Sequence, residues 1–234
     1  ARGRGDVYKR QVYERNGSGP VVVLLHGLGL NRAMWQWLLP SLTDYFDVVT
    51  YDLWGHGESS SPPSAPNLRL FSDQLAGLLN EIRVNITAVV GFSIGGMIAR
   101  RFAFDYPPRL AALVILNSAH DRTPIENEAV QIRAEHAYAN GPAAMVDAAL
   151  ERWFTPNFRL ENPETMDLVR GWLEANDPEI YPGIYRVLAD GNAELVDIIQ
   201  SINCPTLVMT GEGHVGNSPK LAGPMAEIIP EGRS

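Results

Sequence analysis

Apolar and polar residues along this chain follow two alternating patterns, one typical of strands and the other of helices. Continuous runs of β-branched and apolar residues, PVVVLLHG at 20–27 and ITAVVGF at 86–92, suit strands that are buried on both faces. The segments 33–42, 68–82 and 94–107 space their apolar residues as amphipathic helices do. Strands that alternate with helices predict an α/β fold, with a mostly parallel central sheet and helices on both of its faces.

The alternation stops after about residue 120. Residues 121–196 contain only helical patterns, interrupted by tryptophans and prolines, and a strand-like run, CPTLVMTG, returns at 204–211. A helical block between two strands of one sheet predicts a cap over the sheet's carboxyl edge, where open α/β sheets bind ligands. We therefore divide the chain into an α/β core, residues 12–120 and 197–234, and a helical cap, residues 121–196.

The first eleven residues do not fit this core. ARGRGDVYKRQ carries five charged residues and shows neither an apolar period nor a helix cap. Its DVYKRQ part resembles a translation of the transposon end that is used to prepare sequencing libraries. We expect residues 1–11 to be a non-native or disordered segment that packs against nothing, and the chain to be a fragment whose native part begins near Val12.

Composition and charge exclude several classes of protein. A chain of 234 residues buries roughly 70% of its unfolded surface and needs no metal or disulfide to hold it together. The net charge of −8, without a basic stripe, argues against nucleic acid as a partner. No apolar run reaches the roughly 18 residues of a membrane span, and no signal peptide is recognisable. We expect a cytoplasmic protein that binds neither nucleic acid nor membranes; its oligomeric state is left open.

Cysteine and glycine usage points to no cofactor. The single Cys204 excludes an internal disulfide, suits a reducing compartment and is expected to be an inert buried thiol. No group of histidine, cysteine and acidic residues has the spacing of metal ligands. GLGLNR at 27–32 lacks the third glycine of a dinucleotide-binding loop.

The candidate chemistry lies in GFSIGG at 91–96. Ser93 stands between Gly91 and Gly95, where a predicted strand turns into a predicted helix. The G-x-S-x-G pattern in this context is typical of a serine nucleophile on a strained turn, because small residues let the two backbones approach closely. The N-terminus of the following helix favours negative charge at the serine.

A serine nucleophile needs hydrogen-bond donors for the oxyanion of the reaction. We assign this role to the backbone N–H groups of Ile94, directly after the serine, and of Leu28, in the HGLG loop at 26–29. Glycines free that loop to turn its N–H groups inward. His26 is expected to hold the loop and not to act in catalysis.

Together, HGLG, DLWGHGESS, GFSIGG and CPTLVMTGE resemble the α/β-hydrolase fold family in their order and spacing, over residues 12–234. The stretch ALERWFTPNF at 149–158 resembles the cap of the 3-oxoadipate enol-lactonase group and of related small esterases. The resemblance implies that the first long strand lies beside the strand of the serine. It also implies an acyl-enzyme hydrolase of a small-molecule carboxylic ester or lactone, with no cofactor and a triad in the order serine, acid, histidine.

The acid of this triad is ambiguous. The family places it on the loop after the strand PTLVMTG, in a G-x-x-D pattern, and the corresponding residue here is His214. Aspartate and histidine codons differ by one base, so a sequencing error or natural variation explains the histidine. Asp121, after the preceding strand, and Glu212 are the alternatives.

The general base is missing from the predicted site. The family places its histidine after a further strand, whereas PEGRS at 230–234 leads toward a strand and helix that the chain does not contain. His56 belongs to the GHG turn and is expected to be structural. His120 and His136 are expected to line the pocket or the surface. We therefore expect the chain as printed to be largely inactive.

Other residues and other functions complete the hypothesis. Phe92 and Trp153 are candidates for substrate binding, and Trp35 and Trp37 are expected to pack in the core. Ser93 argues against a haloalkane dehalogenase, which uses aspartate as its nucleophile. A hydrolase of carbon–carbon bonds and a cofactor-free haloperoxidase remain alternatives on the same fold. A ligand-binding protein without catalysis is a further alternative, which His214 favours.

Overall fold

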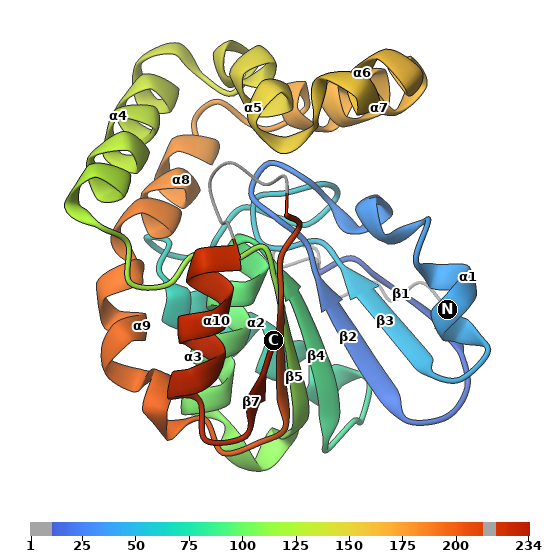
Figure 1. Ribbon diagram of the computed structural model, residues 1–234. Helices are drawn as coiled ribbons and strands as arrows, with labels where there is room; N and C mark the ends of the chain where they lie inside the picture. Colours follow the sequence, from blue (N-terminus) through green and yellow to red (C-terminus); the bar gives the residue numbers. More distant parts are fainter. Residues whose placement is uncertain (1–10, 213–218) are drawn as a thin grey trace.

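The computed structural model describes residues 11–212 and 219–234, without the side chains of residues 219–221. Its strands form one sheet in the order β1-β3-β2-β4-β5-β6-β7 (Figure 1). Their bounds are Tyr13–Gly17 (β1), Val21–Leu25 (β2), Asp47–Tyr51 (β3), Thr87–Phe92 (β4), Leu110–Leu116 (β5), Thr206–Met209 (β6) and Gly232–Arg233 (β7). Only β1 pairs antiparallel within the described sheet. The predicted α/β fold is confirmed, as is the adjacency of β2 and β4.

The expectation that the chain contains no further strand after β6 is wrong in one respect. Gly232 and Arg233 pair in parallel with Thr206 and Leu207 and form β7. The backbone N–H of Thr206 donates to the carbonyl of Glu231 at 3.0 Å. The end of the chain thus continues the sheet beyond β6.

Helices cover the two faces of the sheet unequally. On one face lie α2 (Leu68–Glu81), α3 (Ile94–Asp105), α9 (Asn192–Ile198) and α10 (Pro219–Ile228) (Figure 1). The apolar residues of these helices form one buried cluster with strand residues such as Val23 and Leu25, which are fully buried. On the other face, Trp35, Leu39 and Leu42 pack against Val22, Leu24 and Val48.

The helix that we predict over residues 33–42 is interrupted. The structure has a 3₁₀ turn at Arg32–Trp35 and a short helix α1 at Leu39–Thr43. Pro40 explains the break, because proline lacks the N–H that would bond to the preceding turn and its ring clashes there. Trp35 is buried as expected, whereas Trp37 is 57% exposed, so the prediction that Trp37 packs in the core is wrong.

A block of helices lies between β5 and β6 along the chain. It consists of α4 (Pro124–Asn140), α5 (Val146–Trp153), α6 (Pro156–Glu161), α7 (Pro163–Glu174) and α8 (Tyr181–Asp190), which we call the helical insert. The described chain has no strand within residues 121–196. Figure 1 shows α4 to α7 above one end of the sheet. The proposed boundary at residue 196 runs through α9, which contacts α3 of the core.

The described part of the chain begins inside the fold. Gln11 is buried, and its Nε2 donates to the carbonyl of Gln74 at 3.1 Å. The neighbouring Val12 receives a hydrogen bond from Asp52 N–H and donates to Ser59 Oγ, which ties this segment to the sheet. The prediction that the first eleven residues pack against nothing is therefore wrong for Gln11. Residues 1–10 lie outside the described residues.

None of the described helices combines the length and the apolar character needed to cross a membrane.

Candidate active site

Ser93 occupies the sharp turn between β4 and α3. Its backbone has φ of 56° and ψ of −117°, a left-handed conformation that costs a serine about 1–3 kcal/mol. The turn tolerates only glycine around it: a Cβ on Gly95 would lie 2.5 Å from the carbonyl oxygen of Leu25, and one on Gly91 would collide with the carbonyl of Gly95. The sequence-based expectation of a strained turn at Ser93 agrees with this geometry.

Hydrogen bonds hold the backbone of this turn in place. Ser93 N–H donates to the carbonyl of Leu116 at 2.9 Å, and Ser118 Oγ donates to the carbonyl of Ser93 at 2.7 Å. Arg100 in turn donates to Ser118 Oγ at 2.9 Å and to the carbonyl of Ala119 at 2.7 Å. The turn is thus fixed from β5 and from the helix that follows it.

The guanidinium of Arg100 is a buried cation directly beneath this turn. Burial lowers its pKa to about 9, so it stays charged at neutral pH. No carboxylate among the described residues pairs with it; its partners are carbonyl oxygens, Ser118 and, at 3.5 Å, His120 Nδ1. Sequence reasoning missed this residue, although an arginine within the otherwise apolar run IGGMIA-R was a visible signal.

The predicted oxyanion donors lie next to Ser93. Leu28 borders the same pockets as Ser93 and is buried, and Ile94 is the first residue of α3. Within the described chain, neither Leu28 N–H nor Ile94 N–H donates a hydrogen bond to another protein group. Two backbone donors therefore remain available for a ligand oxygen.

Two buried histidines brace the HGLG loop. His26 Nε2 accepts from Leu53 N–H at 2.9 Å, and His56 Nε2 accepts from Gly29 N–H at 3.0 Å. Because a backbone N–H can only donate, both rings must be neutral and carry their proton on Nδ1, which lies near the carbonyls of Gly27 and Trp54. Burial lowers the pKa of His26 to about 4 and that of His56 to about 3. Their expected structural role agrees with these contacts.

No described residue is in place as the general base. Ser93 Oγ has no hydrogen-bond partner in the described part of the chain. His120 is buried beside Arg100, and burial lowers its pKa to about 4, whereas His136 is exposed on α4. The candidate acid His214 lies outside the described residues.

The alternative acids receive no structural support. Asp121 (φ of 46°) and Glu212 are both exposed, and no hydrogen bond within the described residues joins either to a histidine. The acid therefore stays a prediction.

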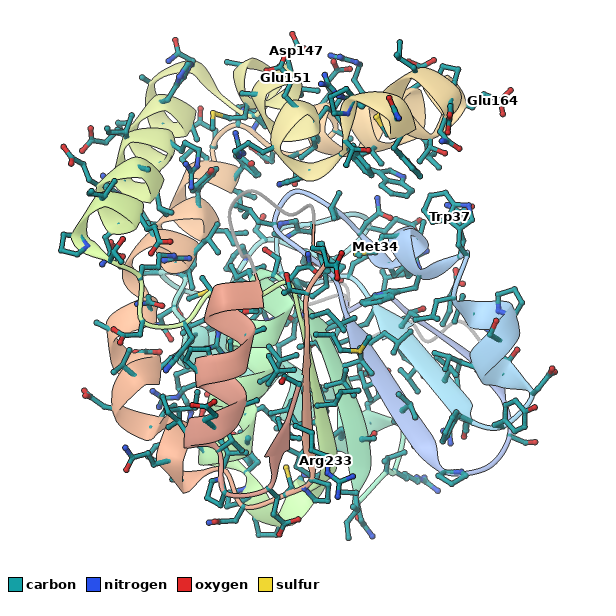
Figure 2. The ribbon with its side chains drawn as sticks, in the orientation of Figure 1. Met34, Trp37, Asp147, Glu151, Glu164 and Arg233 are labelled. Carbon is teal, nitrogen blue, oxygen red and sulfur yellow. The ribbon has the colours of Figure 1, made fainter. Side chains whose placement is uncertain are left out.

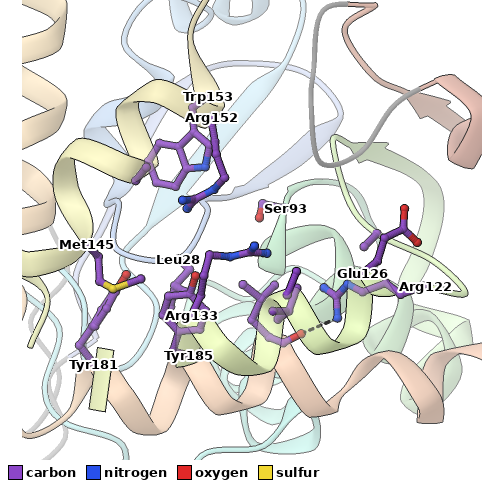
Figure 3. Close-up of a pocket in the computed structure, with 15 residues that line it drawn as sticks. Leu28, Ser93, Arg122, Glu126, Arg133, Met145, Arg152, Trp153, Tyr181 and Tyr185 are labelled. Carbon is purple, nitrogen blue, oxygen red and sulfur yellow. Dashed lines mark hydrogen bonds between the residues drawn. The ribbon is translucent and has the colours of Figure 1, made fainter. Parts of the chain in front are cut away.

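A cationic pocket of about 280 Å³ opens at Ser93 (Figure 3). We define it by Leu28, Ser93, Arg122, Arg133, Arg152 and Tyr181, with Trp153 and Tyr185 at its walls. Figure 3 shows Arg133, from α4, extending toward Ser93, and Arg152, from α5, beside Trp153. Sequence reasoning missed the three arginines, because nothing in their local spacing brings them together.

An aromatic pocket of about 330 Å³ opens on the other side of Ser93. Its walls include Trp37, Phe92, Trp153, Phe154 and Trp172, and Leu28, Ser93 and Trp153 line both pockets. The candidates Phe92 and Trp153 are thus both placed beside Ser93. Figure 2 shows Met34 and Trp37 on the core side, below the insert, and the ring centres of Trp37 and Trp172 are 6.4 Å apart. The exposed Trp37 is explained by this pocket.

Among the described residues, no three histidine, cysteine or acidic side chains are grouped so that they could hold a metal ion. Cys204 is buried, and burial raises the pKa of its thiol.

Comparison with known proteins identifies the family. A family model described as alpha/beta hydrolase fold matches residues 20–175. The chain belongs to the alpha/beta hydrolase fold family. Among its relatives, 3-oxoadipate enol-lactonase 2 of Acinetobacter baylyi is 29% identical over 82% of this chain and 70% of that protein. The (E)-2-((N-methylformamido)methylene)succinate hydrolase of the same organism is 27% identical over 94% of this chain and 82% of its own.

Solved structures of alpha/beta hydrolases agree with this assignment. The enol-lactonase of Burkholderia xenovorans LB400 superimposes with a TM-score of 0.89 at 25% identity, covering 96% of this chain and 86% of that one. A thermophilic esterase from Thermogutta terrifontis has a TM-score of 0.87 at 29% identity, over 96% of this chain and 83% of its own. These similarities support a hydrolase acting on a small molecule.

Proposed function

We propose that this alpha/beta hydrolase cleaves carboxylic esters or lactones through an acyl-enzyme on Ser93. The observation that carries the proposal is the left-handed conformation of Ser93, beside two free backbone donors and at the junction of two pockets. A serine that is strained in this way and faces open space is more consistent with a reactive group than with a packing residue. The similarity to proteins named enol-lactonase and esterase supports the same chemistry.

The reaction follows from this arrangement. Ser93 Oγ attacks the carbonyl carbon and gives its proton to a histidine, while Leu28 N–H and Ile94 N–H donate to the developing oxyanion. The carbon–oxygen bond of the leaving group then breaks, and the protonated histidine returns the proton to the departing oxygen. Water, deprotonated by the same histidine, releases the acid and restores the serine.

The base in this scheme is proposed to lie outside the described residues. Position 214, Asp121 and Glu212 remain the proposed places for its carboxylate partner. Triad members act as a unit, and loss of the histidine from a serine hydrolase costs on the order of 10⁶ in kcat. We therefore expect little turnover from the chain as printed. We expect turnover from a version extended by the coding sequence that follows in its source DNA, where this encodes a strand, a helix and a histidine.

Hydrolysis of p-nitrophenyl acetate tests the proposal. The extended protein should turn it over, Ser93→Ala should abolish turnover, and trypsin-digest mass spectrometry should find the acyl group on the peptide that contains Ser93. In the same background, His214→Asp should raise kcat, since a carboxylate would orient the histidine and stabilise its charged form. Turnover that survives Ser93→Ala would show that the nucleophile is wrong. An extended protein that contains the histidine but stays inactive would favour the ligand-binding alternative.

A further inference from the structure

Two pockets of different chemistry meet at Ser93. The cationic pocket and the aromatic pocket are each near the lower end of the range of roughly 300–1,000 Å³ that small-ligand sites occupy. Leu28, Ser93 and Trp153 belong to both, so a ligand carbonyl at Ser93 has one group on each side.

The cationic pocket holds more positive charge than the described protein neutralises. Arg122 donates to the carbonyls of Leu188 and Ala189 and thereby caps the end of α8. Arg152 donates only to Ala148 of its own helix, and Arg133 has no hydrogen bond or ion pair within the described residues. Two guanidinium groups thus face the cavity with most of their donors unused.

Mutual repulsion shows that these charges are close and incompletely balanced. Burial and, after it, the nearby Arg133 lower the pKa of Arg122 to about 10, although Glu126 acts in the opposite direction. Burial also lowers the pKa of Arg152, and Arg133 acts in the same direction. Arg122 nevertheless remains protonated at neutral pH, in a protein whose net charge is −8.

The acidic residue of the described pocket lining, Glu126, balances this charge only in part: it raises the pKa of Arg122 but pairs with no arginine among the described residues. Glu126, the carboxylate on the wall of this pocket, accepts hydrogen bonds from Thr123 N–H and Thr123 Oγ1 at the start of α4. Figure 2 shows Asp147, Glu151 and Glu164 on the outer side of the insert, away from the core. Arg133 and Arg152 thus reach the cavity, whereas these three carboxylates of the insert lie outside it.

The aromatic pocket offers the opposite environment. Its walls are the rings of Trp37, Phe92, Phe154 and Trp172, with Leu30 and Val169 between them. The described lining contains no charged side chain, so desolvating an ion there would be costly, whereas an aromatic or branched apolar group would gain from burial.

We infer that the ligand of this site is an ester with two dissimilar arms, an inference that rests on the proposed function. One arm ends in a carboxylate, which Arg133 and Arg152 bind in the cationic pocket. The other is an apolar group of about the size of a benzyl group, held in the aromatic pocket. The scissile carbonyl lies between them at Ser93. Carboxylates match the forked guanidinium donors, which can bind two oxygens at once.

Three probes that differ in one arm at a time test this inference. Monobenzyl glutarate has both arms, monomethyl glutarate lacks the apolar arm, and benzyl methyl glutarate lacks the charge. Binding is measured on Ser93→Ala by tryptophan fluorescence, since three of the five tryptophans line the aromatic pocket, and by calorimetry. We expect the monobenzyl acid to bind at least about tenfold more tightly than either of the other two.

Variants then assign each arm to its pocket. Arg133→Gln and Arg152→Gln should each weaken binding of the monobenzyl acid by about 10- to 100-fold and leave the diester unaffected. Arg186→Gln is the matched control, because Arg186 is exposed on the same insert and bonds only to Gln131 at the surface. Trp37→Ala should weaken binding of the benzyl probes but not of the methyl acid. Tyr45→Ala, which removes an exposed aromatic side chain that lines neither pocket, should change nothing.

Each half of the inference can fail separately. Equal affinity for the acid and the diester, or arginine variants that behave as the Arg186 control does, would overturn the carboxylate assignment. Equal affinity for the benzyl and methyl acids would overturn the apolar assignment. Because binding is measured without Ser93, a protein that binds the monobenzyl acid as expected but never forms an acyl-enzyme refutes the proposed function and not this inference.

Discussion

Acid should destabilise this protein through the two histidines that brace the HGLG loop. His26 and His56 each use Nε2 to accept from a backbone N–H, so both must be neutral in the folded state. Protonation would place an N–H against another N–H and add a charge in a buried site. The folded state therefore resists protonation of rings that the unfolded chain accepts readily.

The sign and size of the effect follow from the pKa values. Burial lowers the pKa to about 4 for His26 and to about 3 for His56, against about 6.5 in the unfolded chain. The stabilisation is complete above about pH 6.5 and is lost as the pH falls toward about 4. At pH 5.5, one unit below the unfolded pKa, each histidine lowers the free energy of unfolding by about 1.4 kcal/mol. Between pH 7.5 and pH 5.5 the two histidines together should therefore lower it by about 3 kcal/mol. That is a large part of the 5–15 kcal/mol typical of domains.

Urea denaturation at several pH values between 7.5 and 5 measures this loss. His56→Gln should lower stability at pH 7.5, because the acceptor for Gly29 N–H is altered, but should also reduce the pH dependence by about a third, since His26 and the buried His120 keep their lowered pKa values. His136→Gln, at an exposed position on α4, should leave the curve unchanged. If His56→Gln retains the full pH dependence of the parent, the buried neutral histidine is not its source.

Further predictions concern the backbone around the site. The free energy of unfolding should be about 1–2 kcal/mol higher for Ser93→Gly than for Ser93→Ala, because glycine relieves the strain at φ 56° that alanine keeps. Equal stabilities would argue against strain. Gly95→Ala should cost about 3 kcal/mol or more, whereas Gly77→Ala, in open space on α2, should stabilise by about 0.5–1 kcal/mol, both read from urea midpoints. Asn176→Ala, which removes a buried donor to Gly29 O, should cost about 1–2 kcal/mol in the same assay, and no loss would refute its role.

The sheet and the serine turn are predictable from sequence because both depend on local patterns. Residues 68–82 predict the helix that the structure places at Leu68–Glu81, since its leucines recur on one face. The strand before Ser93 and the glycines around it specify the turn within ten residues. Where a local rule was overlooked, the prediction failed: Pro40 splits the helix expected over 33–42 and leaves Trp37 outside the core.

The pockets could not be predicted, because they depend on the path of the helical insert. Arg133 and Arg152 are nineteen positions apart, on different helices, and nothing in their spacing indicates that both line a pocket with Ser93. Trp37 and Trp172 are far apart in the sequence, and only the tertiary fold brings their rings close together. Arg100 was detectable as a charge in an apolar run, but its hydrogen-bond partners after β5, Ser118 and the carbonyl of Ala119, were not.

The helical insert and the HGLG loop are connected through one residue, Gly29. Gly29 N–H donates to His56 of the core, while Gly29 O accepts from Asn176, directly after α7 of the insert, at 2.8 Å. The adjacent residue, Leu28, carries the free N–H that we assign to the oxyanion. Asn176 also donates to the carbonyls of Trp172 and Leu173. Helix α7, which forms one wall of the aromatic pocket, is therefore tied to Gly29. A ligand arm that shifts α7 would therefore shift Gly29 and the neighbouring Leu28 N–H with it, so under the proposed assignments binding in the aromatic pocket is coupled to the position of an oxyanion donor.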